Sequence, residues 1–370
     1  YRTRLMANEI EKVNTIAIAD IEKFNGKTDD NIEKLNTLEF AGLASTFYGG
    51  TAVITMGSTR TESYSNRIEH RTIGSSSDAA DFGDLQSIRK EGMGAGSNIS
   101  RGIFAGGLSY VSATNTTIYG VDDTDYITVG SAANAQDFGN LDEPKGYGAR
   151  GGSSNGTLLF TAGGFSQLSG VSTYYDTMEY FTIATLDNGT DGGKDLAGAG
   201  NARGNFTGTD GTTKGLIAGG KDSSFASVNT IQEFTFSTSA NTSDFGDLSQ
   251  VAFDSSAVED LTRAVFQIGY GNNGSSDTVV VDTEYVDIAS DTNASDHGDL
   301  TSAREMVSGA SNGTLGEFYG GKPQGASPNE EIIEKITIQS AGTASADTNA
   351  DFSVGDISGQ HDSGSALSGT

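Results

Sequence analysis

Apolar and polar residues partly alternate through a hexapeptide that occurs six times along this chain of 370 residues. Each copy is rich in β-branched and aromatic residues, which favours a β-strand over a helix. The copies span residues 68–73, 124–129, 178–183, 231–236, 283–288 and 333–338. We therefore expect the same strand to recur in six equivalent units.

Another apolar run, which ends in Gly-Gly, precedes each of these strands. Its copies lie at residues 47–50, 103–107, 161–164, 217–220 and 318–321, with a degenerate copy at 268–271. Intervals of about 50 to 57 residues are typical of solenoids and propellers. The sequence therefore predicts a repeat architecture.

Two more recurring elements complete the unit. Asp-Phe-Gly-Asp-Leu or a close variant follows the hexapeptide, for example at residues 81–85 and 244–248. A further strand then leads to a turn such as Ser-Asn-Gly-Thr at residues 154–157, where Asn-Gly suits a two-residue hairpin. Four strands in each of six units predict an all-β fold, a six-bladed β-propeller over residues 43–370.

The two ends of this region predict how the ring closes. The last residues, Ser368-Gly369-Thr370, match the turn position of the repeat, and the first Gly-Gly strand begins near Ala44. Residues 359–370 are therefore expected to supply the inner strand of the blade that residues 44–85 complete. A ring closed by N- and C-terminal strands of one blade leaves no exposed sheet edge.

Residues 1–42 form a separate segment in this interpretation. Ile-Glu-Lys-x-Asn recurs with a period of 11 at residues 10–14, 21–25 and 32–36. On a continuous helix this period gives an apolar stripe that favours a right-handed supercoil. Asn25-Gly26 favours a break in such a helix, so we expect short helical pieces joined by turns. The apolar stripe is too small to form a core. It consists of Ile10, Val13, Ile21, Phe24, Ile32 and Leu35.

Two interpretations of this segment remain open. It is either an extension that packs on its own domain or an anchor that docks on a larger assembly. We favour the anchor, because a small amphipathic segment has to bury its stripe somewhere.

Composition narrows the possible partners. The formal net charge of −27 disfavours nucleic acid and anionic membranes, which both bind basic surfaces. No apolar run approaches the ~20 residues that span a bilayer. The chain has no Cys, so thiol chemistry is excluded. We interpret the excess of acidic residues as the property of a highly soluble protein. The alternative interpretation is an acidic surface that binds ions.

Residues suited to metal binding or catalysis occupy repeat positions. His70, His297 and His361 lie in different units, and we interpret them as packing variants. Residues 187–192 are rich in oxygen ligands, but they lack the closing Glu of a calcium loop. We expect no metal, no cofactor and no catalytic residue.

Acidic and basic residues also recur once per unit. Because they are repeated, we interpret them as structural pairs within or between blades. The acids are Glu69, Asp125, Glu179, Glu284 and Glu334, and the bases are Arg89, Lys145 and Arg304.

The six units are expected to differ in the length of the loop that follows Gly-Gly. These loops are longest in the first three units, at residues 51–67, 108–123 and 165–177. Aromatic side chains among small polar residues suit glycan binding, although ordinary loop variation is the alternative. The predicted ligand-binding residues are Arg60, Tyr64, Tyr110, Tyr119, Phe165, Tyr174 and Tyr175.

The repeat resembles the kelch repeat. The resemblance is carried by the Gly-Gly runs and by Tyr126, Tyr180 and Tyr285 of the third strand. Phe82, Phe138, Phe245 and Phe352 stand where kelch repeats have an outer-strand Trp. Kelch-like folds include galactose oxidase, whose cofactor joins a Tyr to a Cys. This chain has no Cys, so the resemblance does not extend to that chemistry.

The whole chain is also similar to virion structural proteins of tailed bacteriophages. The Ile-Glu-Lys-x-Asn repeat, which ends in residues 34–40, and the Asp-Phe-Gly-Asp-Leu blades carry this resemblance. It implies a non-enzymatic fibre or appendage on the virion surface. Residues 6–42 would bind capsid, neck or tail proteins in multiple copies, and the propeller would attach to a host-surface glycan. The alternatives are a purely structural decoration and a glycan-cleaving propeller enzyme.

Overall fold

The computed structural model describes most of residues 50–346. The described ranges are 50–55, 65–89, 93–98, 100–110, 118–146, 152–168, 171–197, 202–272, 276–324 and 332–346, with short strands in residues 5–40 and 366–367. The chain divides into two compact units, Tyr1–Phe47 and Tyr48–Thr370. Among the residues searched, no helix is long and apolar enough to cross a membrane.

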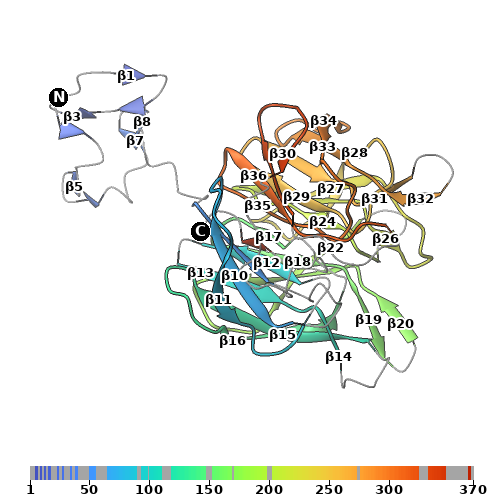
Figure 1. The fold of residues 1–370 in the computed structure, drawn as a ribbon. Helices are drawn as coiled ribbons and strands as arrows, with labels where there is room; N and C mark the ends of the chain where they lie inside the picture. Colours follow the sequence, from blue (N-terminus) through green and yellow to red (C-terminus); the bar gives the residue numbers. More distant parts are fainter. Residues whose placement is uncertain are drawn as a thin grey trace. The chain divides into compact units, whose positions relative to one another are not determined.

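The second unit consists of six antiparallel blades (Figure 1). In order from the inner to the outer strand, blade 1 contains β39 (Ala366–Leu367), β9 (Thr51–Thr55), β10 (Arg67–Thr72) and β11 (Ala80–Asp84). Blade 2 contains β12 (Gly94–Ser97), β13 (Arg101–Ala105), β15 (Ile118–Thr128) and β16 (Gln136–Lys145). Blade 3 contains β17 (Ser153–Ser154), β18 (Leu158–Ala162), β21 (Thr177–Thr182) and β22 (Thr190–Asp195).

The remaining blades repeat this order. Blade 4 contains β24 (Thr207–Gly208), β25 (Lys214–Ala218), β27 (Thr230–Thr235) and β28 (Ser243–Asp247). Blade 5 contains β29 (Ser256–Glu259), β30 (Arg263–Gln267), β33 (Asp282–Asp287) and β34 (Ser295–Asp299). Blade 6 contains β35 (Ser308–Ser311), β36 (Leu315–Tyr319), β37 (Ile333–Thr337) and β38 (Ser345–Ala346). The prediction of an all-β, six-bladed propeller is confirmed.

The burial pattern explains why the second strand of each blade is mostly apolar and does not alternate. In β9, β13, β18, β25, β30 and β36 the last four residues are all buried. A sheet that lies between two other sheets buries both of its faces, so alternation is lost. The third strand is less enclosed and keeps exposed positions, which accounts for its partial alternation.

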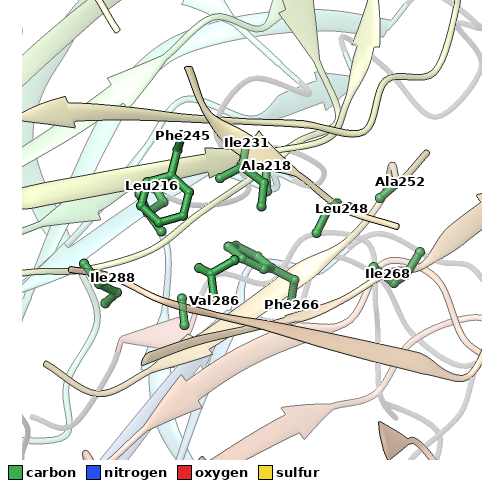
Figure 2. Packing of buried hydrophobic residues seen from close by; sticks show 11 residues of the cluster. Leu216, Ala218, Ile231, Phe245, Leu248, Ala252, Phe266, Ile268, Val286 and Ile288 are labelled. Carbon is green, nitrogen blue, oxygen red and sulfur yellow. The ribbon is translucent and has the colours of Figure 1, made fainter. Parts of the chain in front are cut away.

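Six apolar clusters lie between neighbouring blades in the described part of the chain. Figure 2 shows the cluster between blades 4 and 5, where Phe245 and Leu216 face Phe266 and Val286. Each fully buried side chain of this size contributes about 1.5–3 kcal/mol. The cluster containing Ile54 and Tyr319 joins blade 6 to blade 1, so the blades pack in a closed ring.

The Gly-Gly pair ends the second strand because the backbone turns there through positive φ. Gly106 has φ 69° and Gly107 has φ 109°. A Cβ on Gly106 would lie 2.7 Å from the Lys145 backbone oxygen, so a larger residue is also excluded by space. Gly163, Gly219 and Gly320 repeat the same positive φ.

The structure corrects the position of the first repeat copy. Residues 47–50 resemble the Gly-Gly strand, but the second strand of blade 1 is β9, Thr51–Thr55. The Gly50 oxygen accepts the Ile73 amide, just as the Thr157 oxygen accepts the Ile183 amide, so Gly50 occupies the turn position. Burial decides the register, since β9 places Ala52, Val53 and Ile54 in the core.

This shift changes the predicted asymmetry. The expected long loop of residues 51–67 contains β9 itself, so the comparable loop of blade 1 is residues 58–67. It is no longer than those of the later blades. Long connections therefore belong to blades 2 and 3 alone among the first three blades.

β39 pairs with β9, with Ala366 opposite Ile54 and Leu367 opposite Val53. It therefore lies beside residues 51–55, where the sequence had suggested residues 44–50. β39 also contacts the inner strands β12 and β35. That the ring depends on this strand for folding stays a prediction.

The first unit contains short strands where helical pieces were expected. Three antiparallel pairs follow the 11-residue repeat, and two residues that begin with Asn separate the strands in each. The pairs are β3–β4 (Lys12–Val13, Ile16–Ala17), β5–β6 (Lys23–Phe24, Lys27–Thr28) and β7–β8 (Lys34–Leu35, Leu38–Phe40). β1 (Leu5–Met6) and β2 (Glu9–Ile10) pair with each other, and β2 also pairs with β8.

The helical expectation was therefore wrong for these residues. An Asn-led pair between two β-prone dipeptides is typical of a hairpin loop. Each 11-residue repeat corresponds to one strand pair and not to three turns of a helix. Of the predicted docking residues, Ile10, Val13, Phe24 and Leu35 lie in these strands, whereas Ile21 and Ile32 lie outside the described residues.

Candidate ligand-binding face

Two kinds of connection gather at one end of the blades, which we call the loop face. One kind joins the second strand to the third, and the other enters each blade from the preceding one. Backbone pairing ties them together, since Gly146 pairs with Phe165, Phe253 with Tyr270, and Glu305 with Lys322. The loop face is therefore built on a hydrogen-bonded rim.

The recurring base and acid fix this rim to the blades. Arg89 and Arg304 lie in the connection that enters a blade, and Lys145 ends β16 directly before such a connection. The acid lies on the third strand of the blade that is entered. Arg89 contacts Asp125 at 2.6 Å, and Arg304 contacts Glu334. Lys145 contacts Glu179 in the same way. All of these side chains are buried, so their role is structural, as the repetition indicated.

Blades 4 and 5 depart from this rule. In blade 4, Arg203 donates to Gln232 at 3.0 Å. In blade 5, Ala252 stands in the place of the base, and Glu284 accepts hydrogen bonds from the Ser249 amide and hydroxyl. Burial raises the pKa of Glu284 above its usual value, and the charges of Asp282 and Asp296 add to the rise, while the hydrogen bonds from Ser249 oppose it.

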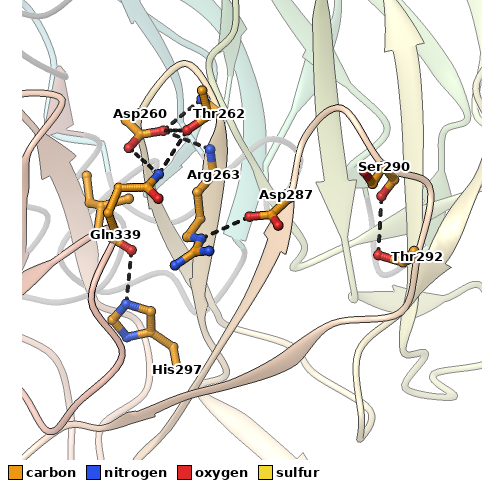
Figure 3. A network of polar contacts seen from close by, with 9 residues as sticks. Asp260, Thr262, Arg263, Asp287, Ser290, Thr292, His297 and Gln339 are labelled. Atoms are coloured by element: carbon orange, nitrogen blue, oxygen red, sulfur yellow. Dashed lines mark hydrogen bonds and ion pairs between the residues drawn. The ribbon is translucent and has the colours of Figure 1, made fainter.

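The opposite end of the blades is occupied by turns that bind one another (Figure 3). Gln339 donates to Asp260 at 2.7 Å, and Arg263 contacts Asp287 at 3.1 Å. His297 is buried there, with Nε2 3.2 Å from the Ile338 oxygen, and burial lowers its pKa. This is the environment of a packing residue.

The other metal candidates also fall at repeat positions. His70 packs edge-on against Phe82, and His361 lies outside the described residues. In residues 187–192, the Asn188 side-chain oxygen accepts a hydrogen bond from the Asn140 amide of the preceding blade. The same bond recurs elsewhere in the ring, where Asn134 accepts from the Asp84 amide and Asn293 from the Asp247 amide. Among the residues described, no group of three His, Asp or Glu side chains is placed to hold a metal ion.

The predicted ligand-binding residues divide into three groups. Arg60 and Tyr64 lie outside the described residues. Tyr110 lies in β14 (Leu108–Tyr110) and Tyr119 in β15, and the pairing of these strands lengthens blade 2 beyond the end of β13. The other three predicted residues belong to blade 3.

Blade 3 carries a projecting hairpin of β19 (Phe165–Leu168) and β20 (Val171–Tyr174), seen in Figure 1. The Phe165 and Tyr174 rings stack with centroids 5.2 Å apart, and both side chains are half-buried. The Tyr175 hydroxyl lies 2.9 Å from the Ser166 hydroxyl. β19 contacts β15, so the structure brings the extensions of blades 2 and 3 together.

Sequence reasoning missed aromatic residues of blades 4 and 5 on the same face. Phe225 lies between β26 (Lys221–Asp222) and β27, and its ring meets the Tyr174 ring edge-on at 5.8 Å. Phe253 stacks on Tyr270 at 4.6 Å, with the Lys221 ammonium 3.7 Å from the Phe253 ring centroid. The sequence analysis selected binding residues by loop length and therefore considered only blades 1–3. The signal that could have identified Phe225 is the occurrence of an aromatic residue between the small residues Ser224 and Ala226 of a short loop.

Comparison with known proteins supports the fold and nothing finer. No protein-family model matches the sequence, and a search among curated proteins finds no relative. Among solved structures, one titled "Structure of YjhT" is similar, with a TM-score of 0.62 and 10% sequence identity. The match covers 80% of this chain and 94% of that one. At this identity the likeness is one of fold alone, a six-bladed β-propeller.

Proposed function

We propose that this chain is a non-enzymatic appendage of a tailed bacteriophage virion. In this proposal residues 6–42 dock on the particle, and a kelch-like propeller displays its loop face for attachment to a host-surface glycan. The observation that carries the proposal is the contrast between two sets of residues. Repeated side chains are used in contacts within the propeller, whereas the aromatic side chains of the β19–β20 hairpin depart from the repeat.

The stacked pair Phe165 and Tyr174 supports glycan binding. Aromatic rings bind the flat C–H faces of sugars, and polar groups beside them bind the hydroxyls. Tyr175, the residue after Tyr174, supplies such a polar group, and the buried Ser166 holds its hydroxyl in place. Connections that depart from a rigid repeat are where binding residues are usually found.

The hairpins of the first unit support docking. Among the described residues, β3–β4 and β5–β6 each form a sheet of only two short strands. An isolated two-stranded hairpin is marginally stable in water, so such hairpins need a further surface. At ~25 cal/mol per Å² of apolar surface, burial of the six apolar side chains of the stripe would provide several kcal/mol. Several copies bound together would make attachment stable.

Deleting residues 6–42 is expected to leave a folded, monodisperse propeller that no longer joins the particle. Changing Tyr64, Tyr110 and Tyr174 together to Ala is expected to preserve assembly and to weaken host attachment. Particle incorporation is measured by sedimentation of purified virions, and attachment by binding of those virions to host cells. A thermal melt of each variant verifies that the propeller is intact.

Leu186→Ala is the matched control, because Leu186 is an exposed apolar residue in the turn between β21 and β22, at the opposite end of blade 3. If the shortened chain fails to fold, the segment belongs to the propeller and is not an anchor. If the Tyr variant attaches normally, the loop face does not bind the host, and the chain is a structural decoration.

A further inference from the structure

Phe225 is the most exposed large apolar side chain among the described residues, with 65% of its surface accessible. Its backbone has φ 64°, a left-handed conformation that a Phe rarely adopts. The chain therefore holds a large apolar ring in water at a backbone position where a Gly or Asn would be favoured. Neither burial nor backbone preference explains Phe at this position.

The other left-handed residues have a structural explanation that Phe225 lacks. Asn205, Asp254 and Met306 are the remaining non-glycine residues with positive φ in the part of the chain described. Each lies two residues after the position of the recurring base, and they are joined in series by backbone hydrogen bonds. Asp254 donates to the Asn205 oxygen at 3.0 Å, and Met306 donates to the Asp254 oxygen at 2.9 Å. Phe225 has no counterpart in this series.

Asp222 holds the Phe225 loop in a fixed shape. Its carboxylate accepts the Ser224 amide at 2.8 Å, the Ser224 hydroxyl at 2.6 Å and the Ala226 amide at 3.0 Å. The Phe225 amide donates to the Asp222 backbone oxygen at 2.9 Å. These bonds preorganise the ring, so a ligand would not have to order it on binding.

The Phe225 ring extends the stacked pair of blade 3 onto blade 4. It meets the Tyr174 ring at an interplanar angle of 89°, and Tyr174 stacks on Phe165. The three rings, which we call the aromatic platform, therefore present surfaces in two orientations across a blade boundary. The aromatic surface is therefore broader than one ring, which suits a polymer better than a single sugar.

The charges around the aromatic platform favour a neutral polysaccharide over an acidic one. Burial raises the pKa of Tyr174 and of Tyr175, and the negative charge of Asp222 adds to the rise at Tyr174 as that of Glu143 does at Tyr175. The cations nearest in the sequence are engaged, since Lys145 contacts Glu179 and Lys221 lies over Phe253. With a chain charge of −27, an acidic polysaccharide would be repelled.

We infer that Phe225, Tyr174 and Phe165 form the binding surface for a neutral polysaccharide, with Phe225 as the residue that the ligand contacts most directly. This inference rests on the proposed function of glycan attachment and assigns that attachment to blades 3 and 4. Neutral sugars stack their C–H faces on the rings, and nearby carboxylates accept their hydroxyl hydrogens.

The test measures retention of the full chain on immobilised mannan, dextran and galactan, which are neutral, and on alginate and hyaluronate, which carry carboxylates. The wild-type chain is expected to bind at least one neutral polymer and neither acidic one. Phe225→Ala is expected to weaken that binding about tenfold or more, the loss that corresponds to ~1.4 kcal/mol. Phe225→Tyr keeps a ring and is expected to bind as wild type does, as is the control Leu186→Ala.

Folding is followed in the same variants. Phe225→Gly removes the ring and suits the positive φ, so its melting temperature is expected to equal or exceed that of wild type while binding is lost. If wild type binds a neutral polymer and Phe225→Ala binds equally well, the platform is refuted and the proposed attachment stands elsewhere on the loop face. Preference for alginate or hyaluronate overturns the assigned ligand class.

Two further outcomes would refute the inference. If wild type binds none of the five polymers, the platform has failed its test and glycan attachment loses its support as well. If Phe225→Ala instead abolishes self-association of the chain in sedimentation experiments, the platform is an interface between copies.

Discussion

Changing Glu317 to Gln is expected to reduce the free energy of unfolding by about 3–5 kcal/mol, because it removes the charge of a buried carboxylate that pairs with a buried Arg across the junction of two blades. Glu317 of blade 6 contacts Arg71 of blade 1 at 3.4 Å, and both side chains are almost fully buried. Its carboxylate also accepts the Gly74 amide at 2.7 Å and the Tyr319 hydroxyl at 2.7 Å. Chemical denaturation with a linear extrapolation measures the change.

The control for this prediction is Asp287→Asn. It breaks a contact of similar length, Arg263–Asp287 at 3.1 Å, but the Asp287 side chain is 58% exposed. Exposed pairs contribute only about 0–1 kcal/mol. Replacing Arg71 and Glu317 together by Met and Leu is expected to recover much of the stability lost in Glu317→Gln. A Glu317→Gln loss no larger than the control loss would show that the junction of blades 6 and 1 does not hold the ring.

Deleting residues 359–370 is expected to abolish cooperative unfolding of the propeller. The deletion removes β39, so β9 keeps β10 but loses its partner on the inner side, and the inner strands β12 and β35 lose the strand that both contact. Two open edges in a ring also favour pairing between chains, which leads to aggregation. Calorimetry of the shortened chain, with light scattering at the same temperatures, measures both effects.

A full-length variant with Ala366 and Leu367 changed to Lys serves as a second measurement. It keeps the chain length and is expected to lower the melting temperature, because Lys has a low preference for strands and would stand opposite the apolar Val53 and Ile54 in the register of this pairing. An unchanged melting temperature in the shortened chain would contradict closure by this strand.

The strands and their number were predictable because each blade repeats the same burial. A second strand between two sheets is buried on both faces and is therefore mostly apolar, and Gly-Gly marks its end through positive φ. The first copy could not be placed this way, since residues 47–50 and 51–55 both present an apolar run near Gly. Only the pairing of β9 with β10 and β39 decides between them.

The site was less predictable for two physical reasons. A period of 11 fits a helical stripe as well as a series of hairpins, and Asn25-Gly26 was interpreted as a break in a helix. Phe225 lies in a short loop, and its importance depends on contact with Tyr174 of another blade. Local sequence does not encode contacts between blades unless they are repeated, as those of Arg89 and Asp125 are.

The most direct test of the proposed function is incubation of the wild-type chain with soluble mannan, dextran and galactan, followed by measurement of both retention and polymer length. Attachment without catalysis predicts that at least one polymer is retained on the chain, that its length is unchanged, and that no reducing ends are released. Shortening of a bound polymer would contradict the account and identify a glycan-cleaving enzyme, and failure to retain any of the three would leave the loop face without its proposed ligand.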